Sequence, residues 1–198
     1  VSPAALSTFT ATPNPVVFSS PITLSATISA AAPAGGLVVP VTCNGAPYAS
    51  IAIAAGATSG STTAKPNTTG TVTLTAALGG VTKSANVTIT PISVTGLTAT
   101  PNPAVMGAPI TVTVTLNGPA LPGWSGVWIT YNGTGWTTIM VPAGATTASA
   151  SVLPLAAGTA TIQAYAGDGS STRTITVNTP STGGTGTATL TTFTATPN

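Results

Sequence analysis

Side chains able to support acid–base or nucleophilic chemistry are few in this sequence. It contains no histidine and one acidic residue, Asp168, together with three basic residues and one cysteine. General acid–base catalysis needs a positioned pair of titratable groups, and a serine nucleophile needs a base beside it. The sequence offers neither arrangement, so we expect no catalytic residue and no enzymatic activity.

A metal site is disfavoured by the same inventory. Cys43 and Asp168 are the only Cys, His, Asp or Glu side chains, whereas zinc and calcium sites need several such ligands. The Gly-Asp-Gly sequence at 167–169 is typical of a tight hairpin turn. Cys43 shares its predicted strand face with Val39 and Val41, which favours a small core residue over a reactive thiol. We therefore expect no metal and no cofactor.

Three tryptophans are the strongest candidates for a binding function. Trp124, Trp128 and Trp136 lie in one stretch of the second half of the chain. The alternation of side chains along a strand predicts that Trp128 faces outward and that Trp124 and Trp136 lie in flanking loops. Exposed aromatic side chains anchor interfaces. Three interpretations stay open: packing against an adjacent domain or loop, a contact with another domain or subunit, and stacking on a sugar.

Three Asn-X-Thr triplets are candidate N-glycosylation sites. They begin at Asn67, Asn86 and Asn132, and Asn86 has the outward parity of its predicted strand. Attached sugars would help to hydrate a surface that carries almost no charge. We therefore include glycans among the candidate partners.

The scarcity of charge excludes other classes of partner. Charged residues make up 2% of the chain, against about one quarter in ordinary soluble domains. Nucleic-acid binding needs clustered Lys and Arg, which are absent. The apolar residues alternate with Thr and Ser rather than forming a run of bilayer-spanning length, so we expect no membrane span. A surface with so few charges favours self-association, and copies of the chain itself are the expected partners.

An internal repeat sets the positions of all these residues. The hexapeptide Thr-Ala-Thr-Pro-Asn-Pro occurs at 10–15 and at 98–103, and its first five residues return at 194–198. Positions 88 apart correspond without gaps through the first unit, which indicates one fold used twice. We assign residues 1–92 and 93–179 to two domains. Residues 180–198 form a Gly/Thr-rich linker and a strand that begins a third repeat.

Apolar and polar residues alternate within each unit. Residues 22–28 and 110–116 both place apolar side chains at every second position, with Thr or Ser between them. This period of two predicts strands with one buried face. Turn sequences such as Pro-Asn-Pro, Asn-Gly and Gly-Gly separate the segments. About seven short strands in about 90 residues predict an all-β chain of two tandem immunoglobulin-like (Ig-like) β-sandwiches.

The loop and turn sequences of the first unit are distinctive. They consist of Ala-Pro-Ala-Gly-Gly at 32–36, Ala-Gly-Ala-Thr-Ser at 55–59, and Gly-Gly-Val-Thr-Lys-Ser at 79–84 leading to the strand that ends at Pro91. These motifs resemble the bacterial Ig-like (Big-type) tandem repeats of large secreted and cell-surface proteins. The resemblance is looser in the second unit, where Ala-Gly-Asp-Gly-Ser replaces the Gly-Gly-Val-Thr-Lys turn. It implies an Ig-like fold and a secreted or cell-surface location, without any catalytic residue.

The two joints of the array differ. Residues 91–96 form a short connection that begins with proline, which predicts a stiff joint, whereas residues 178–187 are Gly/Thr-rich and predict a looser one. After the looser joint, Leu190 and Phe193 correspond to Leu6 and Phe9 of the first strand. Two interpretations stay open: this segment is a donor strand that completes a neighbouring subunit, or it starts a third domain.

Two functions fit these features. The first is a non-enzymatic structural subunit or segment of an extracellular fibre, filament or cell-surface stalk. It would be assembled head to tail through Ig-like domains, with strand complementation by the segment around Leu190 and Phe193 as one route. The alternative is an adhesin or carbohydrate-binding module that uses the three tryptophans. We favour the structural function, because the array and the missing chemistry both point to it.

Overall fold

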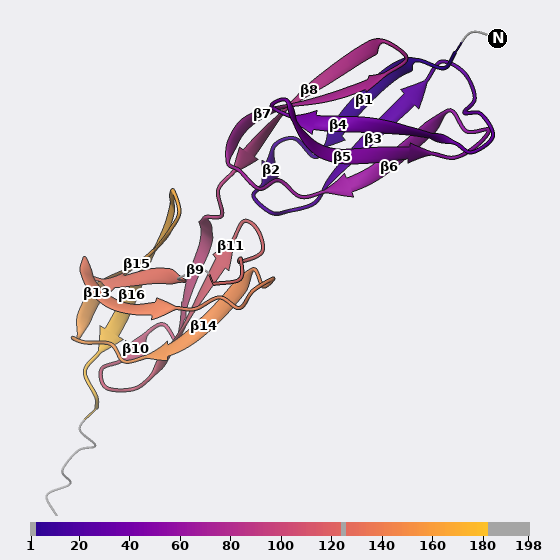
Figure 1. The fold of residues 1–198 in the computed structure, drawn as a ribbon. Helices are drawn as coiled ribbons and strands as arrows, with labels where there is room; N and C mark the ends of the chain where they lie inside the picture. The colour runs from indigo at the N-terminus through magenta and orange to yellow at the C-terminus, as the bar shows by residue number, and fades with distance from the viewer. Residues whose placement is uncertain (1–2, 124–125, 182–198) are drawn as a thin grey trace, which may run out of the picture.

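The chain folds into two β-sandwiches that lie end to end (Figure 1). The computed structural model describes residues 3–123 and 126–181, and these residues form strands but no helix. The prediction of an all-β fold with two tandem sandwiches is confirmed. Because the described residues contain no helix, none of them forms an apolar helix long enough to span a membrane.

Domain 1 is the sandwich made by the first eight strands. Its three-stranded sheet has the order β1-β3-β6, and its five-stranded sheet has the order β2-β8-β7-β4-β5. The strands are β1 (Leu6–Thr12), β2 (Val16–Val17), β3 (Ile22–Ile28), β4 (Leu37–Cys43), β5 (Ala46–Ile53), β6 (Ser59–Ala64), β7 (Gly70–Leu78) and β8 (Val81–Thr90).

Domain 2 repeats this topology with the sheets β9-β11-β14 and β10-β16-β15-β12-β13. Every strand except β12 begins 88 residues after its counterpart, so the ungapped correspondence in sequence is also a structural one. The strands are β9 (Val94–Thr100), β10 (Ala104–Val105), β11 (Ile110–Leu116), β12 (Val127–Tyr131), β13 (Thr134–Ile139), β14 (Thr147–Val152), β15 (Gly158–Ala166) and β16 (Gly169–Asn178).

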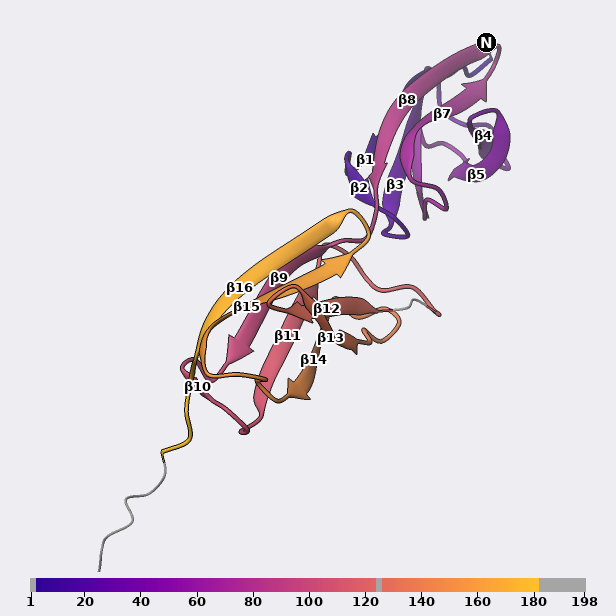
Figure 2. The same ribbon diagram turned by 90° about the vertical axis from the view of Figure 1, so that its left-hand side faces the viewer.

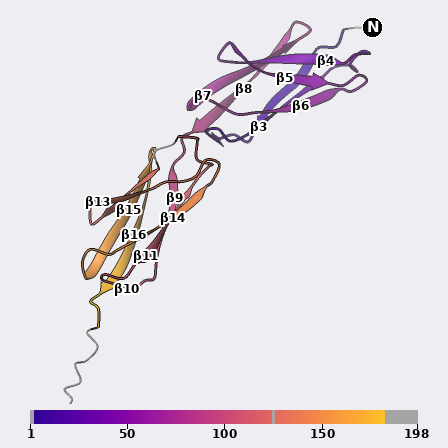
Figure 3. The ribbon, with the colours of Figure 1, turned by 60° about the horizontal axis from the view of Figure 1, so that its bottom comes forward.

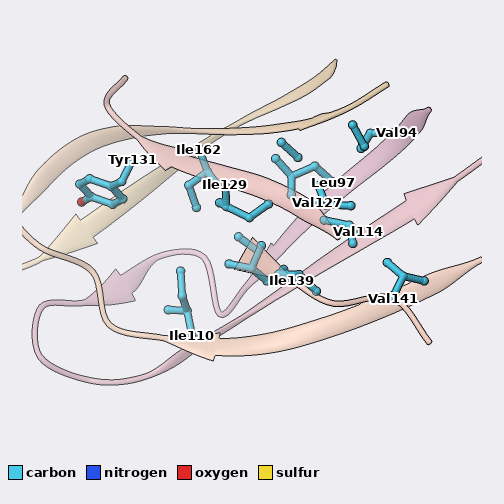
Figure 4. Packing of buried hydrophobic residues seen from close by; sticks show 14 of the residues in the cluster. Val94, Leu97, Ile110, Val114, Val127, Ile129, Tyr131, Ile139, Val141 and Ile162 are labelled. Carbon is cyan, nitrogen blue, oxygen red and sulfur yellow. The ribbon is translucent and has the colours of Figure 1, made fainter. Parts of the chain in front are cut away.

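The core of each sandwich comes from the alternating apolar positions. In domain 2, Ile110 and Val114 from one sheet face Ile129 and Ile162 from the other (Figure 4). The intervening Thr and Ser side chains point to solvent, because successive residues of a strand face opposite sides. Burial of the apolar face is the main favourable term in folding, and here it needs no charged residue.

The Pro-Asn-Pro turn carries the chain from one sheet to the other. Before it, β1 pairs with β3, and after it, β2 pairs in parallel with β8. The Nδ2 of Asn14 donates to the carbonyl oxygen of Asn86 at 2.8 Å, and its Oδ1 accepts from the backbone N–H of Thr88 at 2.9 Å. The side chain of Asn14 thus pairs with β8 where the backbone of the turn does not.

Replacement of Asn14 by Ala is expected to lower the free energy of unfolding of domain 1 by about 1–2 kcal/mol, since two hydrogen bonds to β8 are lost. Urea unfolding of the full chain measures this change. Asn67→Ala, in an exposed loop of the same domain, is the matched control and should leave stability unchanged. Equal stabilities of the two variants would contradict this role of Asn14.

Candidate functional site

The candidate binding surface is an aromatic pair on the outer face of the five-stranded sheet of domain 2. Trp128 on β12 lies directly opposite Tyr165 on β15, and their ring centroids are 6.2 Å apart. The side chains are 55% and 37% exposed, so both rings reach solvent. We call these two residues the outer aromatic pair.

Neutral polar groups surround the outer aromatic pair. The hydroxyl of Tyr165 donates to Oε1 of Gln163 at 2.9 Å, which fixes the phenol ring over the sheet. A Cβ added at Gly135 would lie 3.3 Å from Cζ2 of Trp128, so the missing side chain leaves room for the indole over β13. The surface therefore combines two aromatic faces with amide and hydroxyl groups and has no charged member.

Trp136 does not join this pair. It lies in strand β13 rather than in a loop as predicted, and it is the extra residue of a register shift between β13 and β12. A β-bulge of this kind re-aims the side chain. Trp136 packs edge-on against Tyr131 at a centroid distance of 5.0 Å and covers the core of domain 2. Trp128 and Trp136 thus belong to opposite faces of the sheet, and Trp124 lies outside the described residues.

Domain 1 has no equivalent of the outer aromatic pair. The positions that correspond to Trp128 and Tyr165 hold Pro40 and Ala77. The same strands form the same sheet in both domains, so the fold does not require aromatic residues there.

The three candidate glycosylation residues are all exposed. Asn67 lies in the loop between β6 and β7. The Oδ1 of Asn86 accepts from the hydroxyl of Thr73 at 2.9 Å, and the Oδ1 of Asn132 accepts from the backbone N–H of Thr161 at 2.7 Å. Exposure makes all three accessible, and glycosylation at each stays a prediction.

Cys43 and Tyr48 lie together at the edge of the core of domain 1. Both are half-buried, and they line a small cavity beside Pro66. Burial raises the pKa of the Cys43 thiol, so its nucleophilic thiolate form is disfavoured. Burial, and secondarily the charge of Cys43, also raise the pKa of Tyr48. Within the described residues, no three His, Cys, Asp or Glu side chains come together.

Leu190 and Phe193, the candidate donor-strand residues, lie outside the described residues. Their counterparts in domain 1, Leu6 and Phe9, are buried in its core. Strand β1 of domain 1 pairs with β3 from Leu6 to Thr12 with one register shift, and β9 pairs with β11 in the same way. Each sandwich therefore already contains its own first strand.

The joint between the domains is a second candidate site, and the sequence predicted only its stiffness. Phe18, just after β2, packs against the cores of both domains. It lines an open apolar cleft of about 230 Å³ with Thr69 of domain 1, Pro91 and Ile92 of the connection, and Leu121 of domain 2. The alternation of residues 16–18 does not show that Phe18 contacts both domains rather than the core of domain 1 alone.

Asn117 of domain 2 holds the connection in place. Its Nδ2 donates to the carbonyl oxygen of Pro91 at 3.1 Å, and its Oδ1 accepts from the backbone N–H of Ser93 at 2.9 Å. The turn between β15 and β16 lies beside the same connection (Figure 2), where a Cβ at Gly167 would lie 2.3 Å from the carbonyl oxygen of Ile92. The connection is therefore packed from two sides.

The chain is similar to solved structures of tandem Ig domains. The I9-I11 tandem from titin is 19% identical with a TM-score of 0.42, and the match covers 86% of this chain and 65% of that fragment. The titin domains z1z2 in complex with telethonin are 15% identical with a TM-score of 0.38, covering 90% and 98%. The D0-D1 domain of intimin is 16% identical with a TM-score of 0.34, covering 88% and 99%.

This chain thus spans just under two thirds of the I9-I11 fragment. No family model matches the sequence, and no curated protein matches it. These likenesses concern the fold, which the strand order of the chain itself establishes as a tandem of Ig-like domains.

Two tyrosines offer a matched test of the cores. The hydroxyl of Tyr131 donates to the carbonyl oxygen of Ala156 at 3.1 Å, whereas the buried hydroxyl of Tyr48 has no partner among the described residues. Tyr131→Phe should therefore lower the free energy of unfolding of domain 2 by about 1 kcal/mol, while Tyr48→Phe should leave domain 1 equally or more stable. Urea unfolding measures both changes.

The pH dependence gives a second readout. Because the folded state raises the pKa of Tyr48, the unfolded tyrosine ionises first, and its contribution to stability is lost above about pH 10. Tyr48→Phe should remove that part of the alkaline decline. The assignment would be contradicted if, at neutral pH, Tyr48→Phe lowered the free energy of unfolding of domain 1 by more than Tyr131→Phe lowered that of domain 2.

Proposed function

We propose that this chain is a structural segment of an extracellular stalk or fibre made of Ig-like domains arranged end to end. The observation that carries the proposal is the packed joint. Phe18 packs against the cores of both domains, and Asn117 binds the connection on both sides of Ile92. A joint of this kind restricts bending, which a purely flexible linker would allow.

The path of the chain suits a load-bearing role. The chain enters domain 1 at one end of the particle, and β16 leaves domain 2 at the opposite end (Figure 3). Tension along the array would pass through each sandwich in turn. The hydrogen-bonded pairing of β1 with β3 and of β16 with β15 would resist it.

The composition supports an extracellular array. The motifs at 32–36, 55–59 and 79–84 resemble bacterial Ig-like repeats of secreted and cell-surface proteins. The few charges and the abundance of Thr and Ser give a neutral, hydroxyl-rich exterior, and the exposed Asn67, Asn86 and Asn132 would accept sugars.

In this proposal, Leu190 and Phe193 take the places of Leu6 and Phe9 in a further repeat, either of the same chain or of a neighbour. Donation to a neighbour would proceed by strand exchange, since β1 already occupies its place beside β3. An end-to-end array needs no such exchange, so strand complementation is the less favoured route of assembly.

A second candidate function is carbohydrate recognition by the outer aromatic pair. Trp128 and Tyr165 present two exposed rings in a neutral, hydroxyl-rich surrounding, which suits stacking on an uncharged sugar. The absence of an equivalent pair in domain 1 favours a role beyond the fold. Trp136 has no part in this surface, because it covers the core.

Phe18→Ala tests the stiff joint. We expect small-angle X-ray scattering of wild type to fit one extended arrangement, and that of Phe18→Ala to show a broader range of maximum dimensions. Phe18 is half-buried against the core of domain 1. Phe18→Ala should therefore lower the free energy of unfolding of domain 1 by about 1–2 kcal/mol, which is less than the loss for a fully buried Phe. Val38→Ala, exposed and outside the joint, is the control. Wild-type scattering that requires a broad range of arrangements would refute the stiff joint, and identical scattering of Phe18→Ala and wild type would refute the role of Phe18 in it.

Trp128→Ala tests the second candidate. If the outer aromatic pair recognises sugars, the wild type should bind neutral oligosaccharides on a glycan array. Trp128→Ala should then lose at least tenfold in affinity, as expected when about 1.4 kcal/mol of stacking is removed. Met140→Ala, another exposed apolar position of domain 2, should bind like wild type. Absence of binding by the wild type would eliminate carbohydrate recognition.

A further inference from the structure

The end of domain 2 that points away from domain 1 exposes an apolar surface. Val105 and Met106 are 39% and 37% exposed, and Leu153 and Leu155 in the loop between β14 and β15 are exposed as well. These four make up half of the large exposed hydrophobic residues in the described part of the chain. We call them the distal patch.

The distal patch occupies the positions that form the joint in domain 1. Val105 and Met106 correspond to Val17 and Phe18, which pack against domain 2. The backbone presents both pairs in the same way. The N–H of Phe18 donates to the carbonyl oxygen of Thr90 at 2.8 Å, and the N–H of Met106 donates to that of Asn178 at 2.9 Å.

The loop that carries Leu153 and Leu155 is the counterpart of a second part of the joint. In domain 1 the corresponding loop runs beside Phe18: the N–H of Ser19 donates to the carbonyl oxygen of Pro66 at 3.2 Å, and Thr69 lines the cleft. Domain 1 has Lys65 and Asn67 where domain 2 has Leu153 and Leu155. The end of domain 2 is therefore more apolar than the equivalent end of domain 1.

The opposite end of the chain offers the complementary half. Gly118, Pro119 and Leu121 lie at the end of domain 2 that meets Val17 and Phe18. Their counterparts at the end of domain 1 that points away from domain 2 are uncharged and small or apolar, and they are at least partly accessible: Ala30, Ala31 and Pro33. We call these three residues the proximal patch.

The loop that carries the proximal patch has the backbone of its counterpart. The N–H of Ala32 donates to the carbonyl oxygen of Ala57 at 2.9 Å, as that of Ala120 does to Ala145 at 2.8 Å. The N–H of Ala5 donates to Oγ of Ser29 at 3.1 Å, where Asn117 accepts from Ser93 in domain 2. Both halves of the joint are thus built at the two ends of the described part of the chain, where no described residue covers them.

We infer that the distal patch docks onto the proximal patch of a second copy of this chain, which repeats the joint between molecules. The inference rests on the proposed structural function and names its contact surface. Two different patches meet in such a contact, so it propagates along a line and does not close into a dimer. The patches contain no charged residue, so no ionic group has to be desolvated when they meet.

One difference sets the geometry of the intermolecular joint. A Cβ at Gly118 would lie 2.6 Å from Cγ1 of Val17, and the proximal patch has Ala30 at that position. The second copy must therefore sit slightly displaced from the arrangement of domains 1 and 2. Met106, unbranched and flexible where domain 1 has Phe18, suits a displaced contact.

An end-to-end contact between narrow sandwiches buries little area, so the free copies should associate weakly. A disulfide trap detects weak association. Two variants are made in a Cys43→Ala background, one with Met106→Cys and one with Ala31→Cys, each with a tag of a different size. Their equimolar mixture is oxidised, and the products are separated on a non-reducing gel.

We expect the mixed dimer of the two variants to exceed both homodimers severalfold, because only the mixed pair brings the distal and proximal patches together. Val38→Cys, exposed on the sheet of domain 1, replaces Ala31→Cys in the control and should give no such excess. Leu153→Ser with Leu155→Ser in the Met106→Cys variant should reduce the mixed dimer. A statistical mixture equal to the Val38→Cys control would overturn the inference.

Strand exchange gives a distinguishable result. Leu190→Ser with Phe193→Ser in both full-length variants should leave the mixed dimer unchanged if the patches dock directly. Loss of the mixed dimer in these variants would overturn direct docking in favour of a donated strand. The scattering of Phe18→Ala is independent of either result, so a failure here leaves the stiff joint to its own test.

Discussion

The crossing of the chain between sheets is the constraint on which the rest of the structure depends. Asn14 binds the backbone of β8 through both ends of its amide, and β2 then continues along the same strand. This pairing sets Val17 and Phe18 at the end of the sandwich, facing domain 2. The joint, and with it the extended form of the molecule, therefore follows from how the first strand leaves its sheet.

The near absence of charge gives the surfaces their character. Charged residues ordinarily oppose association, whereas the sheet faces here carry mainly Thr and Ser. Half of the large exposed hydrophobic residues in the described part of the chain belong to the outer aromatic pair and to Leu153 and Leu155, where the two domains differ. Because both domains share one fold, these differences carry information about function that the shared core does not.

The sequence predicted the strands and their inward faces well, since alternation with a period of two is the direct consequence of strand geometry. It placed Trp128 outward, where it lies 55% exposed. It placed Trp136 in a loop, whereas Trp136 is the bulged residue of β13, and no local pattern in the sequence indicates that bulge. The sequence did not predict the contact of Trp128 with Tyr165, because β12 and β15 are far apart in the chain and become neighbours only in the folded sheet.

The sequence by itself determined the repeat, the all-β fold and the scarcity of titratable and nucleophilic side chains. Period, alternation and composition can all be read directly from the chain. Only the tertiary structure decided that Phe18 belongs to two cores, that Asn117 holds the connection, and that Trp128 and Trp136 lie on opposite faces. These features depend on which strands meet across a sheet and on how one domain meets the next. Such contacts join residues far apart in sequence, so no local pattern encodes them.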